Sequence, residues 1–111
     1  MIKLTNLNQI ITTLNGTPVA DLSQNKTMTY KSALISICEL HRPSNPGSGE
    51  ALRAFDLGLK LLKAEDGLEL EKKDIEFLKE IVERSAIFLS VVIGRLLHYL
   101  ENAINAKVEK K

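Results

Sequence analysis

The sequence predicts a mainly α-helical fold: a compact four-helix domain with a small N-terminal β-hairpin. Two observations lead to this fold class. Apolar residues recur with a helical period in four segments after residue 28, and Asn15-Gly16 marks a tight turn between two β-branched runs. The chain has 111 residues, of which 44% are hydrophobic and 26% are charged, so it suits a single globular domain. We expect this domain over residues 1–106 and a solvated tail over residues 107–111.

The β-hairpin is predicted over about residues 9–20. Asn and Gly both tolerate a positive φ, which the two-residue type I′ turn requires at both central positions. Asn15 and Gly16 therefore mark the turn, and the β-branched residues on either side suit strands. Pro18 has no backbone N–H to donate, so its strand is expected to be short or at an edge.

The first helix is predicted over residues 29–40. Either Thr27 or Thr29 can supply the side-chain oxygen that caps its N-terminus. The apolar face that we expect to meet the core consists of Tyr30, Ala33, Leu34, Ile37 and Cys38.

The second helix is predicted over residues 49–65. Ser48 is the expected N-cap, and Gly67 is expected to end the helix in the left-handed conformation. Leu57 and Leu61 lie well round the helix from its central apolar stripe, so we expect this helix to contact two neighbours. The central stripe, which we expect to face the core, consists of Leu52, Phe55, Leu59 and Leu62.

The third and fourth helices are predicted over residues 72–84 and 86–106. The fourth is the most apolar of the four, with apolar side chains over about half of its circumference. Because the link around Ser85 is short, the two helices are expected to form an antiparallel pair. The apolar arc of the third helix consists of Ile75, Phe77, Leu78, Ile81 and Val82.

Two leucines lie at the centres of apolar arcs and are predicted to be fully buried: Leu59 in the second helix and Leu96 in the fourth. Replacing either one with alanine is expected to lower the free energy of unfolding by about 2–5 kcal/mol. Small domains have only about 5–15 kcal/mol of stability, so each replacement reports which face of its helix lies inside.

Charge and cysteine content limit the classes of function. Fifteen Lys and Arg residues against fourteen Asp and Glu give a formal net charge of +1, and the basic residues are dispersed, so nucleic-acid binding is less expected than protein binding. Cys38 is the only cysteine, which excludes an internal disulfide and suits a reducing compartment. The longest apolar stretch, residues 86–100, is shorter than the roughly 20 residues of a bilayer span. We therefore expect a cytoplasmic protein without a membrane association.

No catalytic or metal-binding motif is recognisable in the sequence. An EF-hand calcium loop needs oxygen ligands at fixed distances from its invariant glycine. If Gly67 is that glycine, Asp66 is the only residue with a side-chain oxygen among the ligand positions tested, so the motif is not present. The two histidines and the cysteine lack zinc-site spacing, and the glycine-rich stretch 47–49 lacks the lysine of a phosphate loop. No nucleophile is placed beside a base. We expect no enzyme activity, no cofactor and no metal.

A series of short motifs runs between residues 29 and 84. They are Thr29–Leu34, Gly49–Arg53, Leu59–Leu61, Leu68–Leu70 and Lys73–Lys79. In these motifs the chain resembles a group of small phage and prophage proteins that are uncharacterised. After Arg84 the chain is richer in apolar residues than that group. The resemblance implies a phage origin and a bacterial host cell, and it carries no catalytic residues.

These observations predict a non-enzymatic, small phage-type protein that acts through protein–protein interaction, either in virion assembly or on a host factor. The alternative is a nucleic-acid-binding accessory or regulatory protein. A gel-shift assay at low salt tests the alternative, because electrostatic binding to nucleic acid is strongest there.

Two segments are candidates for contact with a protein partner. The first is the stretch 41–49, which holds two prolines and two glycines. It is interpreted either as a plain connector or as a contact loop with His41 and Arg42 at its base.

The second candidate is one side of the fourth helix, where Ser90 and Gly94 lie one turn apart and let another backbone approach closely. A second copy of the chain could pack on this side with two-fold symmetry and form a homodimer. Alternatively, the N-terminal hairpin of the same chain covers it. The residues of this candidate interface are Ile87, Ser90, Val91, Gly94 and His98.

Overall fold

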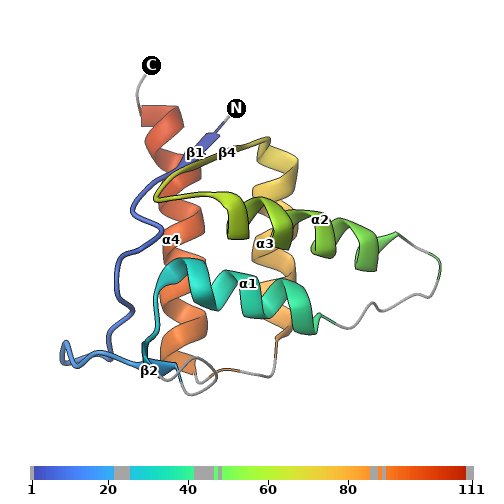
Figure 1. Cartoon of the computed structure of the whole chain (residues 1–111). Coiled ribbons are helices and arrows are strands. Elements are labelled where there is room, and N and C mark those ends of the chain that lie inside the picture. Colours follow the sequence, from blue (N-terminus) through green and yellow to red (C-terminus); the bar gives the residue numbers. More distant parts are fainter. Residues whose placement is uncertain are drawn as a thin grey trace.

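The computed structural model describes residues 2–21, 26–41, 47, 49–85, 88 and 90–109, with the backbone alone at 21, 26 and 106–109. It confirms the predicted fold class, a mainly α-helical chain with small antiparallel β pairs (Figure 1). The elements follow in the order β1 (Ile2–Leu4), β2 (Ala20–Asp21), β3 (Lys26–Thr27), α1 (Tyr30–Leu40), α2 (Glu50–Lys63), β4 (Leu68–Leu70), α3 (Lys72–Arg84) and α4 (Ser90–Glu109).

The helices are arranged as two antiparallel pairs (Figure 1). α3 and α4 lie side by side, as the short link between them predicted. α1 and α2 form the second pair, which lies across α3; α1 packs on α3, and side chains of α2 also reach it. The core lies between these pairs. Its largest fully buried side chains are Leu4, Leu7, Ile11, Leu34, Ile37, Leu61, Leu70, Ile75, Leu78, Ile81, Leu96 and Leu100.

A short sheet that the sequence analysis did not predict joins the N-terminus to the middle of the chain. β1 and β4 are antiparallel, with Ile2 opposite Leu70 and Leu4 opposite Leu68. Two hydrogen bonds continue this contact before β4: the Leu7 amide donates to the Asp66 carbonyl, and the Asn8 amide donates to the Asp66 carboxylate. The N-terminal segment is thereby attached across the connection between α2 and α3.

The predicted hairpin is present, but its turn is not of the predicted type. Gly16 has a φ of 88°, whereas Asn15 does not adopt a positive φ, so the two-residue type I′ turn is excluded. The Gly16 amide donates to the Thr13 carbonyl and the Thr13 amide donates to the Thr17 carbonyl. This pattern is that of a three-residue loop with a left-handed glycine at its end. A single bridge, Thr12 to Pro18, then pairs the two arms.

α1 begins where the sequence predicted. Thr29 is its N-cap: the Thr29 hydroxyl accepts from the Ser32 amide, and the Ser32 hydroxyl accepts from the Thr29 amide, so the two residues form a capping box.

Both ends of α2 differ from the prediction. Its N-cap is Gly49, which has a φ of 87°, while the expected cap, Ser48, lies outside the described residues. The helix ends at Lys63, and Gly67 is not left-handed. The end comes early because Ala64 turns into an extended conformation, where its carbonyl accepts a hydrogen bond from the Lys31 ammonium.

The face of α2 that packs on the core is not the predicted one. The buried residues are Ala54, Leu57, Gly58 and Leu61, whereas Leu59 is only partly buried, so the prediction that Leu59 is fully buried is wrong. The reason is the close approach of α1. A Cβ added at Gly58 would lie 3.2 Å from the Cys38 Cβ, which leaves room for small side chains only. The side of α2 that carries Gly58, together with Leu57 and Leu61, therefore faces inward, and the predicted stripe is turned outward.

The third helix matches its predicted bounds, and its predicted arc is buried. Leu96 of α4 is fully buried, as predicted. The described part of α4 begins at Ser90, and Phe88 lies in a bend before it; residues 86, 87 and 89 of the predicted helix lie outside the described residues. The helix continues to Glu109, so residues 107–109, predicted as part of a fraying tail, are helical.

Candidate functional site

The outward side of α2 carries a row of large apolar side chains, which we call the α2 stripe: Leu52, Phe55 and Leu62 are exposed, and Leu59 is half-buried. Leu52, Phe55 and Leu62 are 67%, 60% and 60% exposed. Their spacing of three, four and three residues is that of the a and d positions of a helix that packs on another helix. These four residues form the central apolar stripe that was predicted to face the core.

A groove of about 440 Å³ runs between α1 and the α2 stripe. Its floor is made of small residues at the helix contact, namely Cys38, Ala54 and Gly58. Ile35 and Glu39 of α1 form one wall. Phe55, Leu59 and Leu62 of α2 form the other. We call this feature the α1–α2 groove.

Cys38 and His41 both line this groove, one turn apart, and together they invite the hypothesis of a thiol nucleophile and its base. Burial raises the pKa of the Cys38 thiol to about 12, with a further contribution from the Glu39 carboxylate. Catalytic cysteines need the opposite, a depressed pKa that yields thiolate near neutral pH. Cys38 therefore serves as a small apolar residue in the helix contact.

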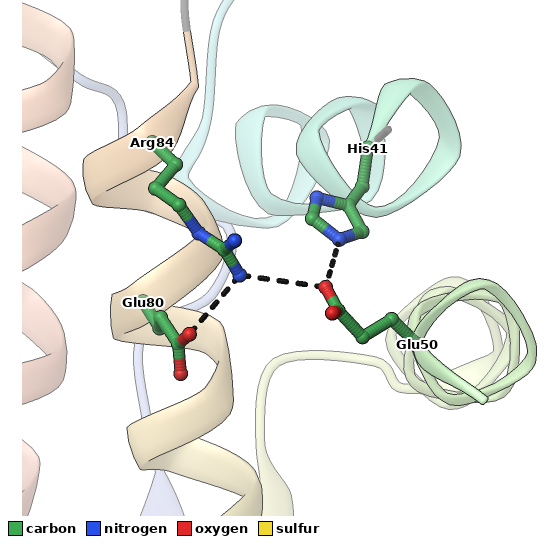
Figure 2. Close-up of polar contacts among 4 residues, drawn as sticks. All are labelled: His41, Glu50, Glu80 and Arg84. Atoms are coloured by element: carbon green, nitrogen blue, oxygen red, sulfur yellow. Dashed lines mark hydrogen bonds and ion pairs between the residues drawn. The ribbon is translucent and has the colours of Figure 1, made fainter. Parts of the chain in front are cut away.

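His41 belongs to a cluster of four polar side chains at one end of the groove, which we call the polar clamp (Figure 2). The His41 Nε2 lies 3.0 Å from Glu50 Oε1, and its side chain is 6% exposed. The same Glu50 oxygen lies 3.4 Å from Arg84 Nη2, which also contacts Glu80 Oε1 at 3.1 Å. The clamp joins the C-terminus of α1, the N-terminus of α2 and the last turns of α3.

The geometry of the polar clamp suits a structural role. Each of the four side chains has its charged or polar atoms directed at another member, as Figure 2 shows. The predicted contact residue His41 is thus turned inward, and Arg42 lies outside the described residues. In the part of the chain that the structure describes, no three His, Cys, Asp or Glu residues are grouped to hold a metal ion.

Arg53 attaches α2 to α3 at the side opposite the groove. Its guanidinium lies 4.4 Å from the centre of the Phe77 ring, and its Nη2 contacts the Asp74 carboxylate at 3.2 Å and the Lys73 carbonyl at 3.0 Å. This basic residue is therefore engaged within the chain rather than presented to a nucleic acid.

The predicted interface on α4 lies beside a second groove, of about 630 Å³. Ser90 and His98 are exposed there, Val91 and Gly94 are partly buried, and a Cβ added at Gly94 would meet no atom within 4 Å. Ile87 lies outside the described residues.

The N-terminal segment packs along one side of this α4 face. Arg95 Nε and Nη2 donate to the Thr12 and Thr13 carbonyls at 3.0 and 2.9 Å. The Tyr99 hydroxyl donates to the Thr5 carbonyl at 2.6 Å, and its ring stacks on Tyr30 with centroids 4.6 Å apart. The chain itself thus covers part of the face that could otherwise receive a second copy.

Comparisons with known proteins identify no relative: no family model, no curated protein and no solved structure matches the chain. None of the helices within the described residues is both long and apolar enough to span a membrane. The candidate site therefore rests on its own geometry. Its strongest feature is the α2 stripe, because it combines large side chains, high exposure and helix-packing spacing.

Proposed function

We propose that this chain is a non-catalytic protein-binding domain whose partner docks on the α2 stripe. The observation that carries the proposal is the exposure of Leu52, Phe55 and Leu62 on one side of a single helix. Burial of each such side chain contributes roughly 1.5–3 kcal/mol, and monomeric proteins rarely leave contiguous apolar patches in water without a function for them. The setting that we propose, from the sequence resemblance, is phage virion assembly or modulation of a host factor.

The test is affinity capture from the cells that express the protein, with three matched baits. Phe55→Asp places a charge in the α2 stripe, where the side chain is 60% exposed, so the variant is expected to fold. Leu14→Asp makes the same kind of change at the tip of the hairpin, where the side chain is 89% exposed and lines the second groove. Circular dichroism of each bait checks that it is folded.

We expect one protein to be captured by the wild-type chain and by Leu14→Asp, and to be lost with Phe55→Asp. The purified partner should then bind with the same dependence on these residues. Equal capture by all three baits contradicts the proposal. Loss with Leu14→Asp alone would place the binding site in the second groove, beside α4.

A further inference from the structure

The second groove, beside α4, has the size of a site for a small molecule. Its volume of about 630 Å³ lies within the range of ligand pockets, roughly 300–1,000 Å³. The stacked rings of Tyr30 and Tyr99 line it together with the apolar side chains of Leu14 and Val91. Such a lining favours a ligand with an aromatic body, because aromatic rings gain from stacking and edge contacts with one another.

Gly94 lies on the α4 side of this groove, and packing within the chain does not require a glycine there. A glycine inside a helix makes it less stable than alanine would, so an isolated one usually has a packing or functional reason. At Gly58 the reason is packing, because an added Cβ would lie 3.2 Å from the Cys38 Cβ. At Gly94 an added Cβ would meet no atom of the described residues within 4 Å. Gly94 therefore leaves open space against the helix backbone, between Ser90 and His98, each about one turn away.

The charged groups that line the groove are positive. Arg95 and His98 are among the described lining residues, and none of those residues is Asp or Glu. The Arg95 Nε and Nη2 atoms donate to backbone carbonyls, whereas its Nη1 atom makes no hydrogen bond and its guanidinium no ion pair with the described residues. A guanidinium keeps its charge at any physiological pH. The groove thus contains a permanent positive charge that no carboxylate of the described chain neutralises.

Two carboxylates of neighbouring segments do not change this result. Glu101 is the only acidic residue of α4 between residues 90 and 105, and its side chain is exposed. The Asp66 carboxylate adds to the effect of burial in raising the pKa of Tyr99, and it accepts a hydrogen bond from the Asn8 amide. Neither carboxylate lines the groove, so the charge that a ligand meets there is that of Arg95.

We propose that the second groove binds a small organic anion, a molecule with one carboxylate or phosphate group on an aromatic body. The anionic group accepts hydrogen bonds from Arg95 Nη1 and from the His98 ring, which are three residues apart on α4 and therefore neighbours on its surface. The body lies over Gly94, against Val91 and the 89% exposed Leu14 side chain. This site is separate from the α2 stripe, so the inference does not rest on the proposed function.

The test titrates the full chain with four probes that share a naphthalene ring and follows the backbone amides by NMR. Naphthoate and naphthyl phosphate are anions, naphthalenemethanol is neutral, and naphthylmethylamine is a cation at neutral pH. We expect at least one anion to bind with a Kd of about 1 mM or lower, roughly five- to twentyfold more tightly than the alcohol. The cation should bind most weakly. The amide shifts should centre on Gly94, Arg95 and His98, and the tighter anion identifies the head group.

Three variants show whether the probe occupies the groove. Gly94→Leu fills the open space with a better helix former, so its melting temperature should not fall, while the affinity for the anion falls at least about tenfold. Asn102→Asp places a carboxylate in the groove and should weaken binding roughly three- to tenfold. Asn105→Asp makes the same change on the same helix, at an exposed position outside the lining. It should change the affinity less than about twofold, because solvent and salt screen its charge.

Several results would overturn the inference. Binding of neither anion removes the site, and equal affinity for the alcohol or the cation removes its selectivity for anions. Unchanged affinity in Gly94→Leu, or amide shifts centred on α2, shows that the probe binds elsewhere. A dimer of the free chain that Gly94→Leu dissociates in sedimentation identifies a second copy as the occupant. All of these leave the capture experiment with Phe55→Asp as a separate test of the α2 stripe.

Discussion

At the scale of single residues, Gly58 marks the side of α2 that faces inward. The Cβ position there is already within 3.2 Å of the Cys38 Cβ, so α1 and α2 can approach closely along the Ala54 and Gly58 side. Both sides of α2 carry leucines, so hydrophobicity alone does not determine which side faces the core. The structure instead buries the side on which helix backbones can meet, because packing density and not only apolar area determines the contact.

Cys38, the other member of that contact, makes stability depend on pH at the alkaline end. Its pKa is raised from 9.0 to about 12 by burial, so the folded chain retains the thiol proton to a higher pH than the unfolded chain does. This contribution to stability is complete below about pH 9 and is lost as pH rises toward 12. By about pH 10.5 the loss should be on the order of 1–2 kcal/mol.

Urea denaturation of the wild type and of Cys38→Ala at neutral pH and at about pH 10.5 measures this effect. Burial also raises the pKa of Tyr99, so both proteins are expected to lose stability at alkaline pH. The wild type should lose more, and the difference between the two isolates the thiol. Parallel losses would show that the Cys38 side chain is solvated in the folded chain.

At the scale of elements, α3 was the most predictable, because its apolar and charged residues separate cleanly around the helix. α1 was predictable at its N-terminus through the Thr29 cap. β1 and β4 were not predictable, because each has three residues and the pairing joins positions far apart in the sequence. Short strands of this kind have no periodicity of their own, and tertiary contacts select them.

The candidate site could be predicted in part. The residues of the α2 stripe are evident in the sequence as an a and d pattern, but the same pattern is typical of a core-facing helix. Only the position of α1 distinguishes the two interpretations. The polar clamp could not be foreseen, since its members come from three helices and no local spacing relates them.

Among the polar contacts between helices, we expect those of Glu50 to contribute most to the free energy of unfolding. Its Oε1 atom receives contacts from both His41 and Arg84, and the His41 side chain is almost completely buried. Glu50→Ala leaves the imidazole without this partner and should cost about 1–3 kcal/mol. Glu80→Ala, which removes a more exposed contact to the same Arg84, should cost less than about 0.5 kcal/mol. Equal losses in thermal or urea unfolding would contradict this role for the clamp.

At the scale of the whole molecule, the N-terminal segment, residues 2–13, connects parts of the chain that are distant in the sequence. β1 pairs with β4, and the Thr5 carbonyl accepts a hydrogen bond from the Tyr99 hydroxyl. The Thr12 and Thr13 carbonyls accept hydrogen bonds from the Arg95 guanidinium. This segment therefore covers part of the α4 surface that could otherwise support self-association. The α1–α2 groove lies on a different pair of helices.

We accordingly expect the chain to be a monomer in sedimentation velocity, also at high concentration. Val91 is partly buried against the core, so Val91→Glu should lower the stability of the fold without changing its association state. If the wild type is instead a dimer, and Val91→Glu converts it into a stable, folded monomer, then α4 is a self-association surface.

The central claim is that the α2 stripe faces solvent, and two neighbouring leucines test it most directly. Leu61 is fully buried and Leu62 is 60% exposed, although they are adjacent and chemically identical. Urea denaturation should show a loss of about 2–5 kcal/mol for Leu61→Ala and of less than about 1 kcal/mol for Leu62→Ala. A larger loss for Leu62→Ala would mean that the stripe packs inside the molecule, and the docking surface would not exist.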